Sequence, residues 1–116
     1  MKVVLLNFDS EQLNQSIETV LPIDGEQRRV YIELRYLEET EKWYLTMTDA
    51  ENGKSYFRYV PIVACYDEVN DLILPFSYKN IGMVFCISMV ENPDTVNPAK
   101  EDMKQFAVVW GDKFDE

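Results

Sequence analysis

The residues of this chain that could do chemistry are few, and their types and spacing fit no common catalytic site. The sequence has no histidine, which removes the commonest general base, the Ser–His and Cys–His nucleophile pairs and most zinc sites. Its two cysteines, Cys65 and Cys86, stand alone among apolar residues, without the paired spacing of a zinc motif. A disulfide between them stays open, although no secretory signal points to an oxidising compartment. We therefore expect no metal ion, no cofactor and no enzymatic activity.

The acidic residues are the remaining candidates for chemistry. A pair of carboxylates of the glycosidase kind stays open on the sequence alone. The acidic loops at 49–52 and 67–71 lack the spacing of a calcium-binding loop, and the isolated glycines form no loop that would cradle a phosphate. Most carboxylates fall in expected turns, where acidic side chains are normally solvated: Glu38, Glu39, Glu41, Asp49, Glu51, Asp67, Glu68 and Asp71. We therefore expect the protein to act through its surface rather than through reactive side chains.

The composition is that of one soluble globular domain. The chain has 116 residues, of which 47% are hydrophobic and 28% charged, and both fractions are ordinary for such a domain. We expect a single β-rich domain over 1–116, with an N-terminal strand and loop at 1–15 and a frayed acidic tail at 111–116. No apolar run approaches the length of a membrane span, so we expect a protein made and kept in a cytoplasm.

The charge is strongly negative. The chain carries 11 basic and 21 acidic residues, a formal net charge of −10. Nucleic acids and anionic membranes would be repelled, because binding to either relies on Lys and Arg. Strong acidity keeps a small protein soluble, and it would also suit a basic partner or a mimic of nucleic acid.

Alternation of apolar and polar residues runs through much of the chain and predicts half-buried strands. In 28–37, for example, Val30, Ile32 and Leu34 share one face, while Tyr31 and Glu33 share the other. Expected strands cover 3–6, 16–23, 28–37, 42–48, 54–60, 61–66, 83–90 and 105–110, with turns at Asp24-Gly25 and Asn52-Gly53. This pattern predicts an all-β fold, an antiparallel meander of about seven or eight short strands that closes as a sandwich or a small barrel.

Prolines refine this assignment. Pro22 places its strand at a sheet edge or ends it early. Pro75 favours an extended segment at 72–74 before a turn at 78–82. Asn97 and Pro98 have the types expected at the start of a helix, so at most one short helix is expected, near 98–104.

Aromatic side chains are the candidates for a protein interface, because Tyr and Trp are enriched at such surfaces. An ordinary amphipathic strand surface would give the same pattern, and that alternative stays open. If several of the aromatics are exposed together, they would mark an assembly surface. The candidate interface residues are Tyr31, Tyr44, Tyr56, Tyr59, Phe76 and Tyr78.

A set of short motifs runs in order through most of the chain. The motifs are Asn14-Gln15-Ser16, Asp24-Gly25, Val30 to Tyr36, Trp43-Tyr44-Leu45, Asp49 with Asn52-Gly53, Val60 to Val63, Asp71-Leu72-Ile73, Pro75-Phe76-Ser77-Tyr78, Ile81-Gly82, Met83 to Ile87 and Phe106 to Trp110. This ordered set resembles the small baseplate plug proteins of contractile phage tails, a family known from a cyanophage baseplate and widespread in prophages. The chain differs from that pattern at Cys65-Tyr66, where a small residue such as glycine is usual, and in a longer acidic insert at Asp67-Glu68.

The resemblance implies a structural subunit of a tail baseplate, near the junction of tube, hub and spike. Its expected partners are baseplate, hub, spike and tube proteins and further copies of itself, in a virion or phage-like particle built in a host bacterial cytoplasm. The family implies no catalytic residue. The competing hypothesis is a small acidic binding protein or inhibitor that mimics nucleic acid, which would need acidic side chains in a stripe.

Overall fold

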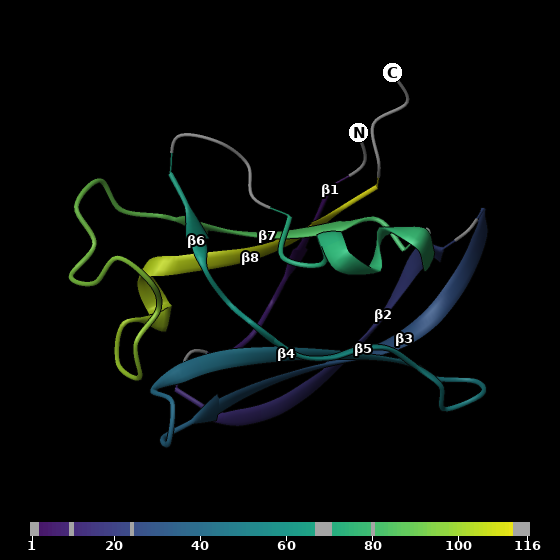
Figure 1. The fold of residues 1–116 in the computed structure, drawn as a ribbon, viewed down its shortest axis with the longest axis horizontal. Coiled ribbons are helices and arrows are strands. Elements are labelled where there is room, and N and C mark those ends of the chain that lie inside the picture. The colour runs from purple at the N-terminus through teal and green to yellow at the C-terminus, as the bar shows by residue number, and fades with distance from the viewer. Residues whose placement is uncertain (1–2, 10, 24, 67–70, 80, 113–116) are drawn as a thin grey trace.

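Two β-sheets of four strands each pack face to face around one hydrophobic core (Figure 1). The structure is a computed structural model that describes residues 3–9, 11–23, 25–66, 71–79 and 81–112. Sheet A has the strand order β1-β8-β7-β6, and sheet B has the order β2-β3-β4-β5. The expected all-β sandwich is therefore confirmed, whereas the expected acidic turn at 67–70 and the tail from 113 onwards lie outside the described residues.

Sheet B is an antiparallel meander in which each strand pairs with the next. Its strands are β2 (Asn14–Ile23), β3 (Glu26–Leu37), β4 (Lys42–Asp49) and β5 (Ser55–Pro61). As the alternation predicts, Ile32 and Leu34 are buried, while Tyr31 and Glu33 face solvent. Pro22 lies in β2, which is an edge strand.

Sheet A joins strands that are far apart in the sequence. Its strands are β1 (Val3–Leu6), β6 (Ala64–Cys65), β7 (Met83–Ser88) and β8 (Phe106–Gly111). β1 and β7 flank β8 in antiparallel pairs, and β6 pairs parallel with β7. The predicted meander is thus found in sheet B, whereas in sheet A the first and last strands are neighbours. All residues of β8 are buried, which makes it the innermost strand.

Two tryptophans anchor the core between the sheets. Trp43 and Trp110 are fully buried, and each indole N–H donates to a backbone carbonyl, Trp43 to Ala99 at 2.9 Å and Trp110 to Ile81 at 2.8 Å. Gly82 is required beside Trp110: its φ is +88°, and a Cβ there would lie 2.6 Å from the Gly111 carbonyl oxygen and 2.7 Å from the indole ring.

The connections differ from the sequence expectation in two places. Leu74 is not extended but begins a 3-10 helix, η1 (Leu74–Lys79), and the expected helix near 98–104 is reduced to η2 (Met103–Gln105). Asn97 does not cap a helix, because its side-chain oxygen accepts the backbone N–H of Ala64 at 3.0 Å. It therefore ties the loop before η2 to β6.

A bulge explains the mixed pattern of β5. Met47 pairs with Phe57 and Leu45 pairs with Val60, so β5 has one extra residue between the two pairs. Phe57 and Val60 are both buried, while Tyr59 is half exposed with a φ of +50°. The extra residue therefore leaves Tyr59 exposed between two buried positions of the strand.

Candidate assembly surface

The outer side of sheet A is an apolar surface formed by one parity of each of its strands. Register places Leu5, Val109 and Phe85 in one row across β1, β8 and β7, on the side away from the core residues Val108 and Cys86. We call this side the apolar face: Val3 and Leu5 of β1, Ala107, Val109 and Gly111 of β8, Met83, Phe85 and Ile87 of β7, and Cys65 of β6.

The apolar face has both projecting and recessed parts. Val3 and Leu5 are 54% and 53% exposed, and Ile87 is 37% exposed. Between these rows, Ala107 and Val109 are only 8% and 6% exposed. β8 therefore forms a shallow valley of small side chains between the larger side chains of its neighbours.

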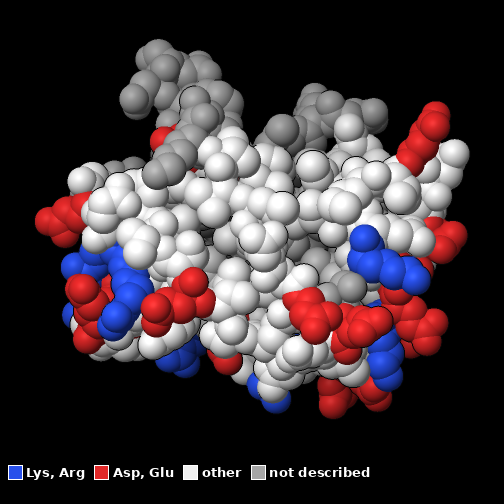
Figure 2. Space-filling model, turned by 180° about the vertical axis from the view of Figure 1, so that it is seen from behind, with Lys and Arg blue, Asp and Glu red and all other residues white. Residues whose placement is uncertain are grey.

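The face is also uncharged. No residue in the strands of sheet A, all of which the structure describes, carries a charge, whereas every strand of sheet B carries at least one. Among the described atoms in Figure 2, most charged side chains lie over the half of the molecule formed by sheet B. An antiparallel sheet with one face in water normally alternates apolar and polar residues. The strands of sheet A depart from that alternation, because their outer side is apolar as well.

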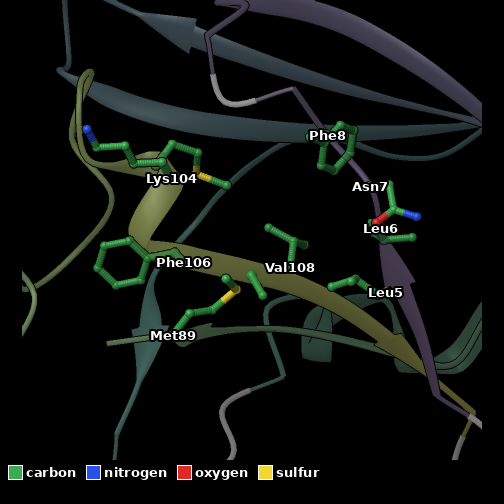
Figure 3. Close-up of a pocket in the computed structure, with 10 residues that line it drawn as sticks. Leu5, Leu6, Asn7, Phe8, Met89, Lys104, Phe106 and Val108 are labelled. Atoms are coloured by element: carbon green, nitrogen blue, oxygen red, sulfur yellow. The ribbon is translucent and has the colours of Figure 1, made fainter. Parts of the chain in front are cut away.

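A pocket of about 240 Å³ opens at one end of the apolar face (Figure 3). The pairing of β1 with β8 ends at Leu6 and Val108, so the first residues of β8 have no partner on that side. Leu5 and Ala107 line both the pocket and the face, and Met89 and Phe106 extend the apolar lining. In Figure 3 the amino group of Lys104 is turned away from these side chains. Most of the other lining residues belong to the core or pack against it, so the pocket lies between the apolar face and the core.

A second cluster joins ionisable side chains at the other sheet. The carboxylate of Asp49 is 2% exposed, which corrects the expectation that it is a solvated turn residue. Its Oδ2 atom accepts the Tyr56 hydroxyl at 2.6 Å and two guanidinium N–H groups of Arg28 at 2.7 and 3.0 Å. Its Oδ1 atom accepts the backbone N–H groups of Glu51 at 2.8 Å and Asn52 at 3.2 Å.

These contacts define what the Asp49 cluster does. The Tyr56 hydroxyl and the Arg28 guanidinium hold the pKa of the Asp49 carboxyl well below its usual range, so it stays ionised. Both oxygens accept hydrogen bonds from β3, β5 and the turn after β4. The cluster therefore holds these three parts together at one end of sheet B. Within the described ranges, no group of three or more His, Cys, Asp or Glu residues is placed to hold a metal ion.

The two cysteines occupy opposite sides of sheet A, and both are free thiols. Cys86 lies in the core, and burial, together with the neighbouring Cys65, raises its pKa to about 12. Cys65 lies on the outer side, where its thiol donates to the carbonyl of Cys86 at 3.2 Å. Cys86 is therefore a core residue, as the sequence predicts.

The six aromatic candidates do not form one patch. On the outer side of sheet B, Tyr44 and Tyr59 lie edge to face at 6.5 Å, and Arg35 bonds the Tyr59 hydroxyl at 3.4 Å. Tyr31 shares that side but is paired with Thr48, further along the strands. The other members are placed as follows: Tyr56 bonds Asp49, Phe76 packs 6.0 Å from Phe57, and the side chain of Tyr78 lies outside the described part of the structure.

The sequence reasoning missed the apolar face because it favoured aromatic residues. The signal was present: residues 83–90 read as apolar on both parities, and the last strand reads Phe-Ala-Val-Val-Trp. Apolar residues on both parities are typical of a strand with protein on both sides. The structure has core on one side of β7 and solvent on Ile87 on the other.

Comparison with known proteins adds no constraint, since no protein-family model and no curated protein sequence matches this chain. Among the described residues, no helix has the length and apolar character needed to cross a bilayer.

Proposed function

We propose that this chain is a structural subunit of a phage or phage-like contractile tail baseplate, a plug or hub-associated protein at the junction of tube and spike. It acts by protein–protein assembly and has no catalytic role. Its neighbours are baseplate, hub, spike and tube proteins, in a virion or related particle assembled in a bacterial cytoplasm. The ordered motifs that resemble the baseplate plug family motivate the choice of particle.

The apolar face is the observation that carries the assembly part of the proposal. Val3 and Leu5 on the edge strand β1 are half exposed, and Ile87 on β7 is 37% exposed, so apolar side chains of two strands of sheet A lie in water. Monomeric proteins seldom keep a large apolar patch unless it binds something. Burial of apolar area stabilises a contact by roughly 25 cal/mol per Å², before the costs of association, so covering this face would favour binding of a partner.

The direct test is the composition of purified particles. Tail particles are isolated from the bacterium that encodes the chain and analysed by quantitative mass spectrometry, and their baseplates are imaged. We expect the protein in a fixed ratio to tube and spike proteins. Its absence from intact particles would overturn the assignment to the tail, while leaving the apolar face as an interface for another partner.

A second candidate function is the acidic inhibitor, which the net charge of −10 favours. The outer side of sheet B, however, interleaves charges of both signs: Glu18 lies 3.9 Å from Arg29, and Arg35 lies beside Tyr59. A mimic of nucleic acid would need a stripe of like charges. Failure of the purified protein to compete with DNA for basic host proteins would dismiss this candidate.

A further inference from the structure

We infer that the free protein forms a reversible homodimer in which two copies pack their apolar faces against each other. This goes beyond the proposed function, because it concerns the purified chain without any tail partner. The two ideas also fail separately, since a monomeric protein could still enter a particle and a dimer could be absent from one.

Charge is the first reason for choosing a second copy as the occupant. Two molecules of net charge −10 repel wherever charged surfaces meet, and the strands of sheet A carry no charge. Packing through the apolar faces gives the layer order sheet B, sheet A, sheet A, sheet B. With about 10 Å between layers, the two charged sheets lie about 30 Å apart. That separation exceeds the Debye length of about 8 Å in physiological salt, so the repulsion is screened. A strongly basic partner would gain nothing from this face.

Shape is the second reason. The surface in a twofold interface must be complementary to itself, because both copies contribute the same surface. The apolar face has a valley along β8, at Ala107 and Val109, directly beside β7, where Ile87 is 37% exposed and Phe85 is partly buried. A twofold axis parallel to the strands and between β7 and β8 sets Ile87 of each copy into the valley of the other. The strands then run nearly parallel, as in aligned sheet packing.

The area of the apolar face determines how tightly the two copies are expected to bind. β7 and β8 have six residues each, β1 has four and β6 has two. At about 3.3 Å per residue and about 4.8 Å between strands, they give a face of roughly 290 Å². Exposed apolar side chains next to the strand ends add to it: Val63, Tyr66, Met89 and Val90. A standard stable interface buries about 800 Å² on each partner. The face is smaller than that, so we expect a weak dimer with a dissociation constant of about 100 µM rather than a permanent one.

Sedimentation velocity tests the dimer, with the purified protein from about 1 to about 200 µM in about 0.15 M and about 1 M NaCl. We expect a monomer at the lowest concentration and mostly dimer at the highest, with no loss of dimer in high salt. Ile87→Glu places a charge on the apolar face and is expected to weaken association at least tenfold. Val20→Glu is the matched control: Val20 is 54% exposed, against 53% for Leu5, but lies on sheet B, so it leaves the dimer intact.

Three results would overturn the inference: a wild-type protein that stays monomeric throughout, equal weakening by Val20→Glu, or association that continues past the dimer. Near-ultraviolet circular dichroism of the buried Trp43 and Trp110 checks that each variant is folded. Should Ile87→Glu lose that signal, Leu5→Glu at the more exposed β1 position provides the same test.

Discussion

The carboxylate of Asp49 links three parts of sheet B at the scale of single residues. Tyr56 and Arg28 donate to one of its oxygens, and the turn at Glu51 and Asn52 donates to the other. The pKa of Asp49 is lowered by these donors, so the folded protein binds a proton there less readily than the unfolded chain. This contribution to stability is complete above the unfolded pKa of about 3.9 and is lost as the pH falls below it.

Asp49→Asn is therefore expected to lower the urea midpoint at about pH 7. The wild type loses stability between about pH 5 and pH 2, and the variant is expected to lose less over that range. The amide keeps the shape of the side chain but removes the negative charge that Arg28 and Tyr56 require. Urea unfolding at several pH values measures both effects. Glu33→Gln, which removes an exposed carboxylate of β3, is expected to keep the acid-induced loss of the wild type. The same acid-induced loss in Asp49→Asn as in the wild type would refute the role of this carboxylate.

Gly82 provides a second prediction for a single residue. In Gly82→Ala the new Cβ meets the Gly111 carbonyl oxygen and the Trp110 ring at a φ of +88°, so both strain and a clash are added. Gly53→Ala, at a φ of +74° with nothing within 4 Å, adds the strain alone and is expected to cost about 1–2 kcal/mol in free energy of unfolding. Chemical denaturation should give a clearly larger loss for Gly82→Ala. Equal losses would mean that the contact with Trp110 relaxes without cost.

At the scale of elements, local pattern determined how much could be predicted. The strands of sheet B follow from alternation, since Ile32 and Leu34 can be buried only with Tyr31 and Glu33 outside. The pairing of β1 with β8 could not be predicted in this way. Both strands are apolar at every position, so the pattern does not show which side chains face the core or which residues pair. The bulge at Tyr59 and the 3-10 helix at Leu74–Lys79 depend on tertiary contacts rather than on local sequence. The apolar face was missed for the same reason: apolar residues on both parities suit a buried strand and an unpartnered one equally well.

Asn97 tests how a loop supports an element. Its side chain accepts the backbone N–H of Ala64, at the start of the short strand β6. Asn97→Ala leaves that half-buried donor without its partner, and we expect a loss of about 1–2 kcal/mol in the free energy of unfolding. Amide hydrogen exchange at Ala64 should accelerate as well. Asn92→Ala, at an exposed position in the same loop, is the control and should change neither quantity. Unchanged exchange at Ala64 in Asn97→Ala would show that β6 is held by its pairing with β7 alone.

At the scale of the whole molecule, the two sheets differ in the surface that they present. Sheet B carries the charged strand residues and the Asp49 cluster, and its outer side presents charged side chains to solvent. Sheet A has uncharged strands and offers the apolar face with its adjoining pocket. This division accounts for a chain of net charge −10 that still has a surface suited to assembly.

The most direct test of this account compares Leu5→Glu with Val20→Glu in assembling particles. Each variant replaces the deleted wild-type gene in the bacterium that produces the particles, and quantitative mass spectrometry measures how much enters them. We predict that Leu5→Glu, folded and present in the cell, is depleted at least tenfold from the particles, because it places a charge on the apolar face. Val20→Glu, at an equally exposed position of sheet B, is predicted to enter at the wild-type level. Wild-type incorporation of Leu5→Glu would contradict the claim that the protein assembles through the apolar face of sheet A.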